Sequence, residues 1–372
     1  MTKDTLNIGL DTDKNFIDIA IAEPLPKGEV RYYGKIANDK AALLRVVKRL
    51  QKDGRPLRVC YEAGPCGYAI HRWLTDVAGV TCEVVAPSLI PRRSGERVKT
   101  NRRDCLALAK LLRAEELTAV WVPDPAHEAM RDLTRARAAA VADLTRCRQR
   151  IGSLLLRQHV RYVGKPWTKK HRAWLGRLTL EAPAHRLLMG ELLEALDQAQ
   201  ARRDHLKAHI AELVPRWSLA WLVDALQVLR GYELINATTI VAEIGDPRRF
   251  TSPRQLMDYV GLTVSEHSTG ERVQRGRITK AGNGRARKVL VEAAWTYAHT
   301  AKGGKAKAAQ AAPALRAIAD KARHRLSARY RKLRARGKLA PVAVTALARE
   351  SLGFIWAIAQ AAAPAPAPHG RR

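Results

Sequence analysis

Residues 6–22 read LNIGLDTDKNFIDIAIA, two short apolar runs on either side of a polar turn from Asp11 to Asn15. Apolar runs broken by such a turn predict a β-hairpin. A third strand is expected at residues 29–36. Three consecutive strands at the start of the chain favour a sheet as the centre of the first domain.

The following residues alternate between the two types of element. Apolar residues at helical spacing predict a helix over 39–52, and further helices are expected at 68–77 and 101–113. Strands are expected at 57–61 and 81–86, the second ending at Pro87. The order βββαβαβα predicts a mixed α/β sheet flanked by helices.

The rest of the chain is expected to be mostly helical. Apolar residues repeat as a heptad seam over 126–158 and again over 192–213, which predicts two long helices. These helices either pair as an antiparallel hairpin or pair with another subunit. Shorter helices are expected within 223–260, then at 284–300, 314–336 and 342–360, followed by a disordered tail, AAAPAPAPHGRR.

The charge balance narrows the function. Lys and Arg number 66 against 35 Asp and Glu, a formal net charge of +31, which favours binding to a polyanion. The charge is spread along the chain, which argues against a membrane-surface role. Five cysteines form no Cys-x-x-Cys pair, and the N-terminus MTKDTLNIGL lacks a signal peptide. We expect a cytoplasmic, nucleoid-associated protein of bacterial type.

Three carboxylates follow the predicted sheet and its helices. Asp11 and Glu62 each end a predicted strand, and Asp104 shares a helix face with apolar residues. An acid in such a place costs free energy unless it is paired or binds a cation. Each residue taken alone has an ordinary structural explanation, as a turn, solvated or ion-paired residue. Together they predict a site for Mg²⁺, with one or two ions acting in phosphoryl transfer.

A second stretch, residues 261–295, reads GLTVSEHSTGERVQRGRITKAGNGRARKVLVEAAW. It joins a hydroxyl-rich turn to a basic loop and the start of a helix. Ser268 is either a turn residue or a nucleophile beside cations that stabilise charge on a phosphate. The nucleic-acid contacts expected here and near Asp104 are Lys99, Arg102, Arg103, Arg272, Arg275, Arg277, Lys280, Asn283, Arg285 and Arg287. Between the two long helices, residues 164–172 form a basic linker. Trp167 and Trp174 lie amid basic residues and either stack on bases or pack in the core.

These motifs resemble a known family. IGLDTDK at 8–14, YEAGPCGY at 61–68, RVKTNRRDCLALAKLL at 97–112, and two blocks at 242–270 and 276–295 are similar to the DEDD transposases of insertion sequences. Those enzymes are related to the Piv-type DNA invertases and are known as bridge-RNA-guided recombinases. The resemblance implies a RuvC-like, RNase H-fold domain, a serine nucleophile, a guide RNA, and a tetramer in which one subunit's acids face another's serine.

The chain departs from that family at two positions. Asn101 stands where the family usually has its fourth acid, and an amide oxygen can still bind a metal. Thr269 stands where the family commonly has its serine, with Ser268 directly before it. The resemblance therefore leaves two candidate nucleophiles.

The sequence predicts four regions. A RuvC-like catalytic domain is expected over 1–122, a helical coiled-coil and linker region over 123–222, a C-terminal transposase domain over 223–300, and a basic helical extension with a disordered tail over 301–372. The predicted function is Mg²⁺-dependent, RNA-guided cutting and rejoining of DNA by a dimer or tetramer that has no membrane association. The alternatives are a metal-only nuclease that resolves Holliday junctions, and an inactive nucleic-acid-binding protein.

Overall fold

The computed structural model describes residues 4–24, 28–76, 80–91, 100–270, 272–299 and 306–362. The expected contact residue Lys99 and the expected disordered tail from 363 onward lie outside these ranges. The chain divides into two compact units, Met1–Pro123 and Asp124–Arg372, and each is described by itself. The finer domain bounds stay predictions.

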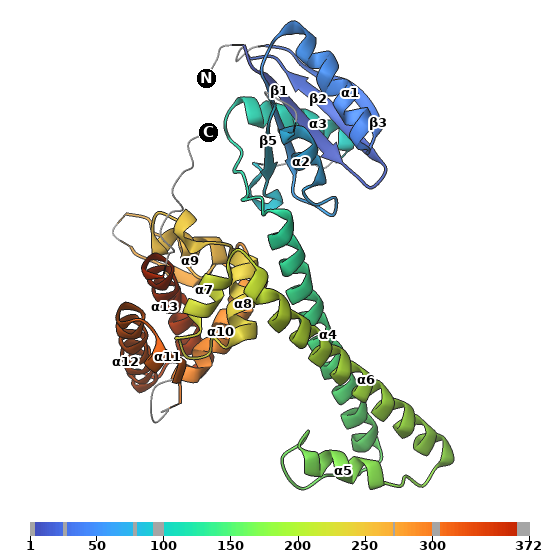
Figure 1. The fold of residues 1–372 in the computed structure, drawn as a ribbon, viewed down its shortest axis with the longest axis vertical. Coiled ribbons are helices and arrows are strands. Elements are labelled where there is room, and N and C mark those ends of the chain that lie inside the picture. Colours follow the sequence, from blue (N-terminus) through green and yellow to red (C-terminus); the bar gives the residue numbers. More distant parts are fainter. Residues whose placement is uncertain are drawn as a thin grey trace. The chain divides into compact units, whose positions relative to one another are not determined.

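The first unit is built on a five-stranded sheet in the order β3-β2-β1-β4-β5 (Figure 1). β1, β2 and β3 are antiparallel neighbours, whereas β1–β4 and β4–β5 are parallel pairs. The hairpin expected at 6–22 and the third strand are confirmed. The strands are β1 Leu6–Thr12, β2 Phe16–Ala22, β3 Val30–Ala37, β4 Leu57–Glu62 and β5 Val80–Val85.

Helices cover both faces of this sheet. Leu43 of α1 and Leu74 of α2 share a core with β-strand residues such as Ile8 and Tyr61. α3 lies against the other face, where Cys105 and Ala109 pack with Ala20. The predicted mixed α/β architecture is confirmed. The helical elements are α1 Lys40–Leu50, η1 Gln51–Asp53, α2 Ala69–Thr75, η2 Pro87–Leu89 and α3 Asn101–Arg113.

The second unit begins with a long helical arm. α4 (Pro125–Arg157) and α6 (Pro183–Leu213) lie side by side in Figure 1. Cys147 of α4 contacts the Ala195 carbonyl, and Met130 near the start of α4 shares a core with Ile210 near the end of α6. The two helices are therefore antiparallel and pair within the chain. A strict coiled-coil geometry stays a prediction.

The turn of the arm differs from the sequence expectation. A nine-residue helix, α5 (Lys169–Arg177), begins within the basic linker. Thr168 begins it, because its side chain accepts a hydrogen bond from the His171 backbone N–H. A single N-cap threonine within a basic segment is a weak sequence pattern, so the sequence predicts a linker here rather than a helix.

The remainder of the second unit is a helical bundle with one small hairpin. α13 lies in its core, with Leu347, Leu352 and Ile355 fully buried. Its length and composition would suffice to cross a membrane, but 56% of its most apolar window is buried among other helices. The elements are η3 Val214–Arg216, α7 Ala220–Leu226, α8 Leu234–Ile244, η4 Pro247–Arg249, α9 Pro253–Val260, β6 Val264–Glu266, β7 Arg275–Ile278, α10 Gly284–Ala294, η5 Trp295–Tyr297, α11 Ala306–Gln310, α12 Pro313–Ala335 and α13 Ala340–Ala361.

Candidate functional site

Three acids stand in one row across the sheet of the first unit. Asp11 on β1 pairs with Asp18 on β2, and Gly9 pairs with Cys60 on β4. Cys60 faces α3, since its thiol contacts the Leu108 carbonyl at 3.7 Å. Residues two apart along a strand point to the same side. Asp18, Asp11 and Glu62 therefore all project toward the α3 face, at the same level on three neighbouring strands.

Asp104 comes to this row from α3. Arg113, at the end of α3, donates to the carbonyls of Glu23 and Gly28, just beyond the end of β2. The end of α3 therefore lies beside the end of β2, and we infer that the two run in the same direction. Since β2 is antiparallel to β1, α3 also runs opposite to β1, and its first turn lies toward Asp11. Gly9 permits the close packing, since an added Cβ would lie 2.4 Å from the Ala109 amide nitrogen.

The donor set fits a hard divalent cation. Asp11, Glu62 and Asp104 are each partly exposed carboxylates, which leaves room for water and phosphate oxygens around an ion. Among the described residues, no three acidic, histidine or cysteine side chains converge closely enough to form a finished metal site. The backbone thus places the three carboxylates on one face, and their role as ligands of a metal ion stays a prediction.

Asp18 and Asp13 hold different places beside Asp11. Asp18 is 5% exposed and accepts a 2.6 Å hydrogen bond from the Tyr32 hydroxyl, which raises the pKa of Tyr32 to about 12. Asp13 accepts backbone hydrogen bonds from Phe16 and Asn15, which hold its pKa below the usual range. Asp18 therefore belongs to the acid row, whereas Asp13 closes the β1–β2 turn.

The residues expected around Asp104 lie at the start of α3. Asn101 is the first helical residue and is exposed, one turn before Asp104. Arg102 lies over the Tyr32 ring, 5.0 Å from its centroid, and Arg103 is exposed. Their expected contacts with metal or nucleic acid stay predictions.

In the second unit, the two candidate hydroxyls lie at the tip of the β6–β7 hairpin. The sequence predicts a turn and a loop here, because the two strands are short and mostly polar. Ser268 donates to Glu266 Oε1 at 2.7 Å and accepts the Gln274 backbone N–H at 3.3 Å. The Thr269 hydroxyl makes no hydrogen bond to any residue that the structure describes. Its backbone bonds to Arg272 close the tip.

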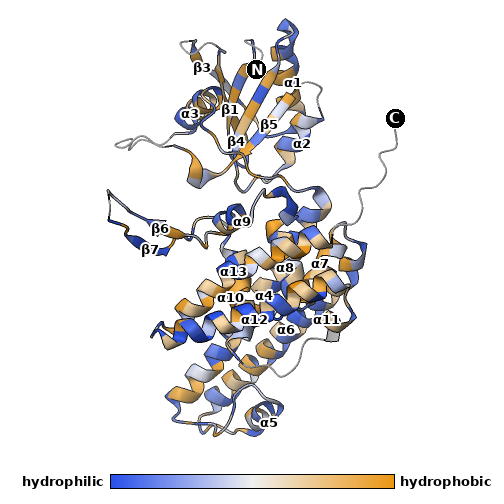
Figure 2. Ribbon diagram, turned by 90° about the vertical axis from the view of Figure 1, so that its left-hand side faces the viewer, coloured by the Kyte–Doolittle hydropathy of each residue, from blue (hydrophilic) through white to orange (hydrophobic). Residues whose placement is uncertain are grey.

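Most of the predicted cations are exposed around this hairpin. The Glu266 carboxylate lies 3.7 Å from Arg275. Figure 2 shows the hairpin as a hydrophilic projection beyond α9. The exposed basic residues here are Arg272, Arg275, Arg277, Lys280 and Arg285. Their side chains are available to phosphates without rearrangement of the core.

Arg287 and the glycines of the 261–284 stretch have structural contacts. Arg287 Nη1 donates to the Val260 carbonyl at 2.7 Å. A Cβ on Gly261 would lie 1.7 Å from the Ala281 carbonyl oxygen, and one on Gly282 would lie 2.1 Å from that of Tyr259. These glycines allow two backbone segments to touch at the base of the hairpin.

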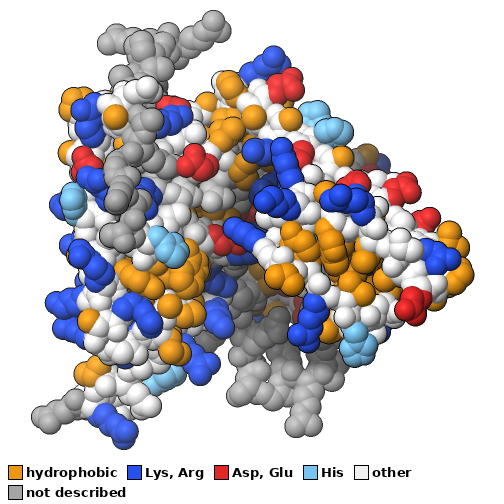
Figure 3. Space-filling model, turned by 90° about the horizontal axis from the view of Figure 1, so that it is seen from below, with side chains coloured by type: hydrophobic (Ala, Val, Ile, Leu, Met, Phe, Trp, Pro, Cys, Tyr) orange, Lys and Arg blue, Asp and Glu red, His pale blue; other side chains and the backbone are white. Residues whose placement is uncertain are grey.

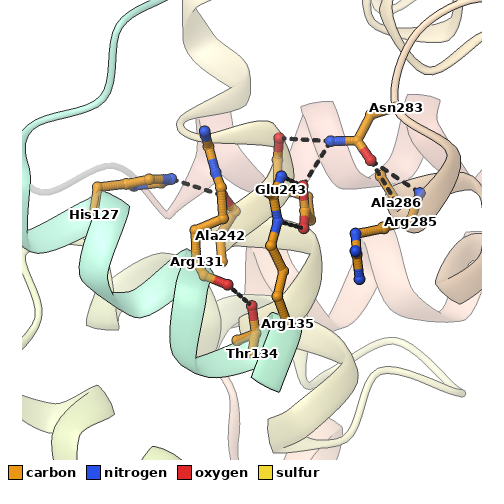
Figure 4. A network of polar contacts seen from close by, with 9 residues as sticks. All are labelled: His127, Arg131, Thr134, Arg135, Ala242, Glu243, Asn283, Arg285 and Ala286. Atoms are coloured by element: carbon orange, nitrogen blue, oxygen red, sulfur yellow. Dashed lines mark hydrogen bonds and ion pairs between the residues drawn. The ribbon is translucent and has the colours of Figure 1, made fainter. Parts of the chain in front are cut away.

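Asn283 joins a buried polar network at the same place (Figure 4). Its Oδ1 caps α10 by accepting the N–H groups of Arg285 and Ala286, and its Nδ2 donates to Glu243 at 2.7 Å. Glu243 on α8 is 1% exposed and receives two hydrogen bonds from Arg135 of α4, at 2.8 and 2.9 Å. Sequence reasoning missed Glu243, Arg135 and Glu266, whose partners are distant or unremarkable along the chain.

Two segments of the chain match known family models. Residues 8–160 match the DEDD-type transposase model of the IS110 group, described as "Transposase". Residues 223–310 match the model described as "Transposase IS116/IS110/IS902 family".

Curated relatives cover nearly the whole chain. A putative transposase, y4qE, from Sinorhizobium fredii is 48% identical over 359 residues, which is 95% of this chain and 88% of that protein. The transposase for insertion sequence element IS1533 of Leptospira borgpetersenii is 29% identical over 89% of this chain and 97% of its own length. A probable family 20 transposase from Pseudomonas aeruginosa is 28% identical over 73% of this chain and 81% of its own length.

Proposed function

The chain belongs to the IS116/IS110/IS902 family of transposases, which act in DNA transposition, and from that premise we propose a two-part mechanism. The first unit is an RNase H-like domain that holds Mg²⁺ through Asp11, Glu62 and Asp104. The hairpin of the second unit supplies a hydroxyl that becomes joined to a DNA phosphate.

The acid row is the observation that carries the proposal. The proposal is supported by the strand register, which aligns Asp11 with the end of β4 at Glu62, and by the packing of α3 at Gly9, which turns the first turn of α3, with Asp104, toward the same end of the sheet. Divalent cations on such donors lower the charge on a phosphodiester and stabilise the attacking and leaving oxygens. The role of the chain is to orient these carboxylates. Asn101 adds a neutral oxygen at the edge of this set.

The hydroxyl step has a base within reach. Ser268 Oγ forms a bond to phosphorus, the bond from phosphorus to a deoxyribose oxygen breaks, and that oxygen takes up a proton. The Glu266 carboxylate, already bonded to the Ser268 hydroxyl at 2.7 Å, is placed to receive the serine proton. The exposed arginines Arg272, Arg275 and Arg277 supply positive charge beside the phosphate. Thr269 is the other nucleophile, with a methyl group that crowds in-line attack.

The partners follow from the charge and the family. DNA is the substrate of the family's reaction, and the net charge of +31 suits a polyanion. We further propose a guide RNA, and a dimer or tetramer in which acids and hydroxyl come from different subunits. Purification of the chain expressed with the DNA that flanks its gene tests the first of these, since a guide RNA would copurify as one defined species.

Trapping the protein–DNA adduct tests the hydroxyl. DNA carrying the element is incubated with protein, run on a denaturing gel, and the linked peptide is mapped. Ser268→Ala abolishes the adduct if Ser268 is the nucleophile, and Thr269→Ala does so if Thr269 is. Ser265→Ala is the control, because its hydroxyl also lies on the hairpin but donates to the Arg277 carbonyl. Recombination that continues with no adduct on either residue refutes the mechanism.

One observation favours the metal-only alternative. Both hydrogen bonds of Ser268 lie within the hairpin, as expected for a residue that stabilises a turn. Under that alternative, Ser268→Ala and Thr269→Ala both retain strand cleavage, and Asp11→Asn and Asp104→Asn both lose it. Asp13→Asn is the matched control, since it removes a carboxylate two residues from Asp11 while its side-chain oxygen can still close the turn. If Asp11→Asn cleaves DNA at the wild-type rate, the proposed metal site is wrong under both mechanisms.

A further inference from the structure

The far end of the arm, where α5 joins α4 and α6, carries an unusual set of side chains. Residues 157–177 contain seven basic residues and no acidic one: Arg157, Arg161, Lys165, Lys169, Lys170, Arg172 and Arg177. Tyr162, Trp167, His171 and Trp174 stand among them. Seen from below, where the α5 end of the arm faces the viewer, blue basic side chains border an exposed hydrophobic patch (Figure 3).

A groove of about 650 Å³ opens at this end between α4, α5 and α6. Its walls combine an aromatic ring, basic side chains, and amide and carboxylate groups. The residues that line it include Arg148, Trp167, Lys169, Arg172, Gly176 and Asp197. The volume is in the range of sites that take a small organic group.

The Trp167 ring is held in place by a constrained backbone. Its φ is +63°, which a residue other than glycine rarely adopts. The Trp167 backbone N–H donates to His171 Nδ1 at 3.0 Å, and the two rings meet edge to face at 5.0 Å. Burial lowers the pKa of His171, which keeps this nitrogen an acceptor near neutral pH. Backbone strain of this kind often accompanies ligand binding.

Arg148 lines the groove and carries an unsatisfied donor. Its guanidinium carbon lies 5.3 Å from the centroid of the Trp167 ring. Its Nε is buried and has no hydrogen-bond acceptor among the residues that the structure describes. A buried N–H without a partner costs free energy, and a phosphate or base oxygen would satisfy it. Arg172 differs, because it forms an ion pair with Asp197 on the opposite wall.

We propose that this groove binds an unpaired nucleotide of single-stranded nucleic acid. The base stacks on Trp167, and the adjoining phosphates contact Arg148 and Lys169. Stacking on an aromatic ring beside basic groups is how proteins hold single strands without reading their sequence. A duplex has no free base to offer, so the groove selects unpaired segments. Within the second unit, the groove is formed by other residues than the hairpin that carries Ser268 and Thr269.

Fluorescence anisotropy with the full chain tests the site. The probes are a labelled single-stranded 12-mer made as RNA and as DNA, the same DNA with abasic positions, and a duplex. Trp167→Ala weakens binding of the single strands by about tenfold or more, and Trp167→Phe restores most of it. The loss disappears on the abasic strand, and duplex binding stays within about twofold of wild type. If RNA binds more tightly than DNA, the groove also contacts the 2′-hydroxyl. If the two bind equally, the groove contacts only the base and the phosphates.

A blocking variant guards against misfolding of the arm. Gly176 lines the groove, and a Cβ there meets no atom within 4 Å, so Gly176→Leu adds bulk to the groove wall from an open Cβ position. Gly190→Leu is the matched control, because Gly190 also has open space and lies on α6 outside the groove. Gly176→Leu reproduces the selective loss, and Gly190→Leu does not. The proposal fails if Gly176→Leu and Trp167→Ala leave single-strand binding unchanged, or if duplex and single strand weaken equally.

Discussion

Removal of the Glu243 carboxylate is expected to loosen the whole second unit. Glu243→Ala removes the carboxylate that accepts two hydrogen bonds from Arg135 and one from Asn283, at the junction of α4, α8 and α10. Loss of one partner from a buried ion pair costs about 3–5 kcal/mol. The Arg135 side chain is 40% exposed and can rehydrate, so the lower end, about 3 kcal/mol, applies.

Thermal unfolding followed by the helical circular dichroism signal measures this loss. For a unit of this size, each kcal/mol lowers Tm by about 2–4 °C, so Glu243→Ala lowers Tm by roughly 6–12 °C. Glu292→Ala is the control, because Glu292 is 55% exposed and pairs with Lys288 only at 3.9 Å. A Tm for Glu243→Ala that matches this control would show that the network does not hold the unit together.

The same carboxylate gives a pH dependence. Burial by itself raises the pKa of Glu243, but hydrogen bonds from Arg135 and Asn283 outweigh it and hold the pKa below its usual value. The stabilisation is therefore fully present above the unfolded pKa of about 4.3, and it is lost as pH falls through the lower folded pKa. Glu243→Gln lacks this ionisation. Its stability should fall less than that of the wild type between neutral pH and acid, and an equal fall would contradict the assignment.

Three further predictions concern other parts of the chain. Gly282→Ala places a Cβ 2.1 Å from the Tyr259 carbonyl oxygen at φ +81°, so it should lower the free energy of unfolding by about 2 kcal/mol or more, whereas Gly284→Ala, which meets only a flexible arginine at 3.4 Å, should not. Asp18→Asn should lower the pKa of Tyr32 from about 12 toward 10, which NMR of labelled tyrosine can measure. An unchanged pKa would show that the Tyr32 hydroxyl does not bond to Asp18. Three exposed cations of the hairpin region, Arg275, Arg277 and Lys280, can be changed together to glutamine. The slope of log binding constant against log salt concentration for duplex DNA should then become shallower by up to about 2.7. An unchanged slope would locate the DNA contacts on another surface.

Much of the fold could be predicted because its elements have clear periodicity. The 6–22 hairpin and the helix expected at 101–113 were found from apolar patterning alone, and β1, β2 and α3 match them. The β6–β7 hairpin has no clear sequence signature, because its strands are short and mostly polar, with only Val264 and Ile278 as an apolar pair. The sequence does not indicate that α4 pairs with α6, because a heptad seam has the same pattern within a chain and between chains.

The candidate site was only partly visible in the sequence. Asp11 and Glu62 stood out because each ends an apolar strand, but their common level depends on register between strands. Asn283 was expected to contact nucleic acid, and its side chain caps α10 and holds Glu243. That partner is 40 residues away, so no local pattern marks it.

The arm has two separate cores on one pair of helices, and this makes its end exchangeable. Leu144, Ile151 and Leu196 belong to a distal core, whereas Met130 and Ile210 belong to the core of the bundle. α4 spans about 50 Å, so substitutions in the distal core are remote from the bundle. Chimeras that take residues 144–196 from a related transposase should therefore fold, and the end of the arm can differ between related transposases while the bundle stays the same.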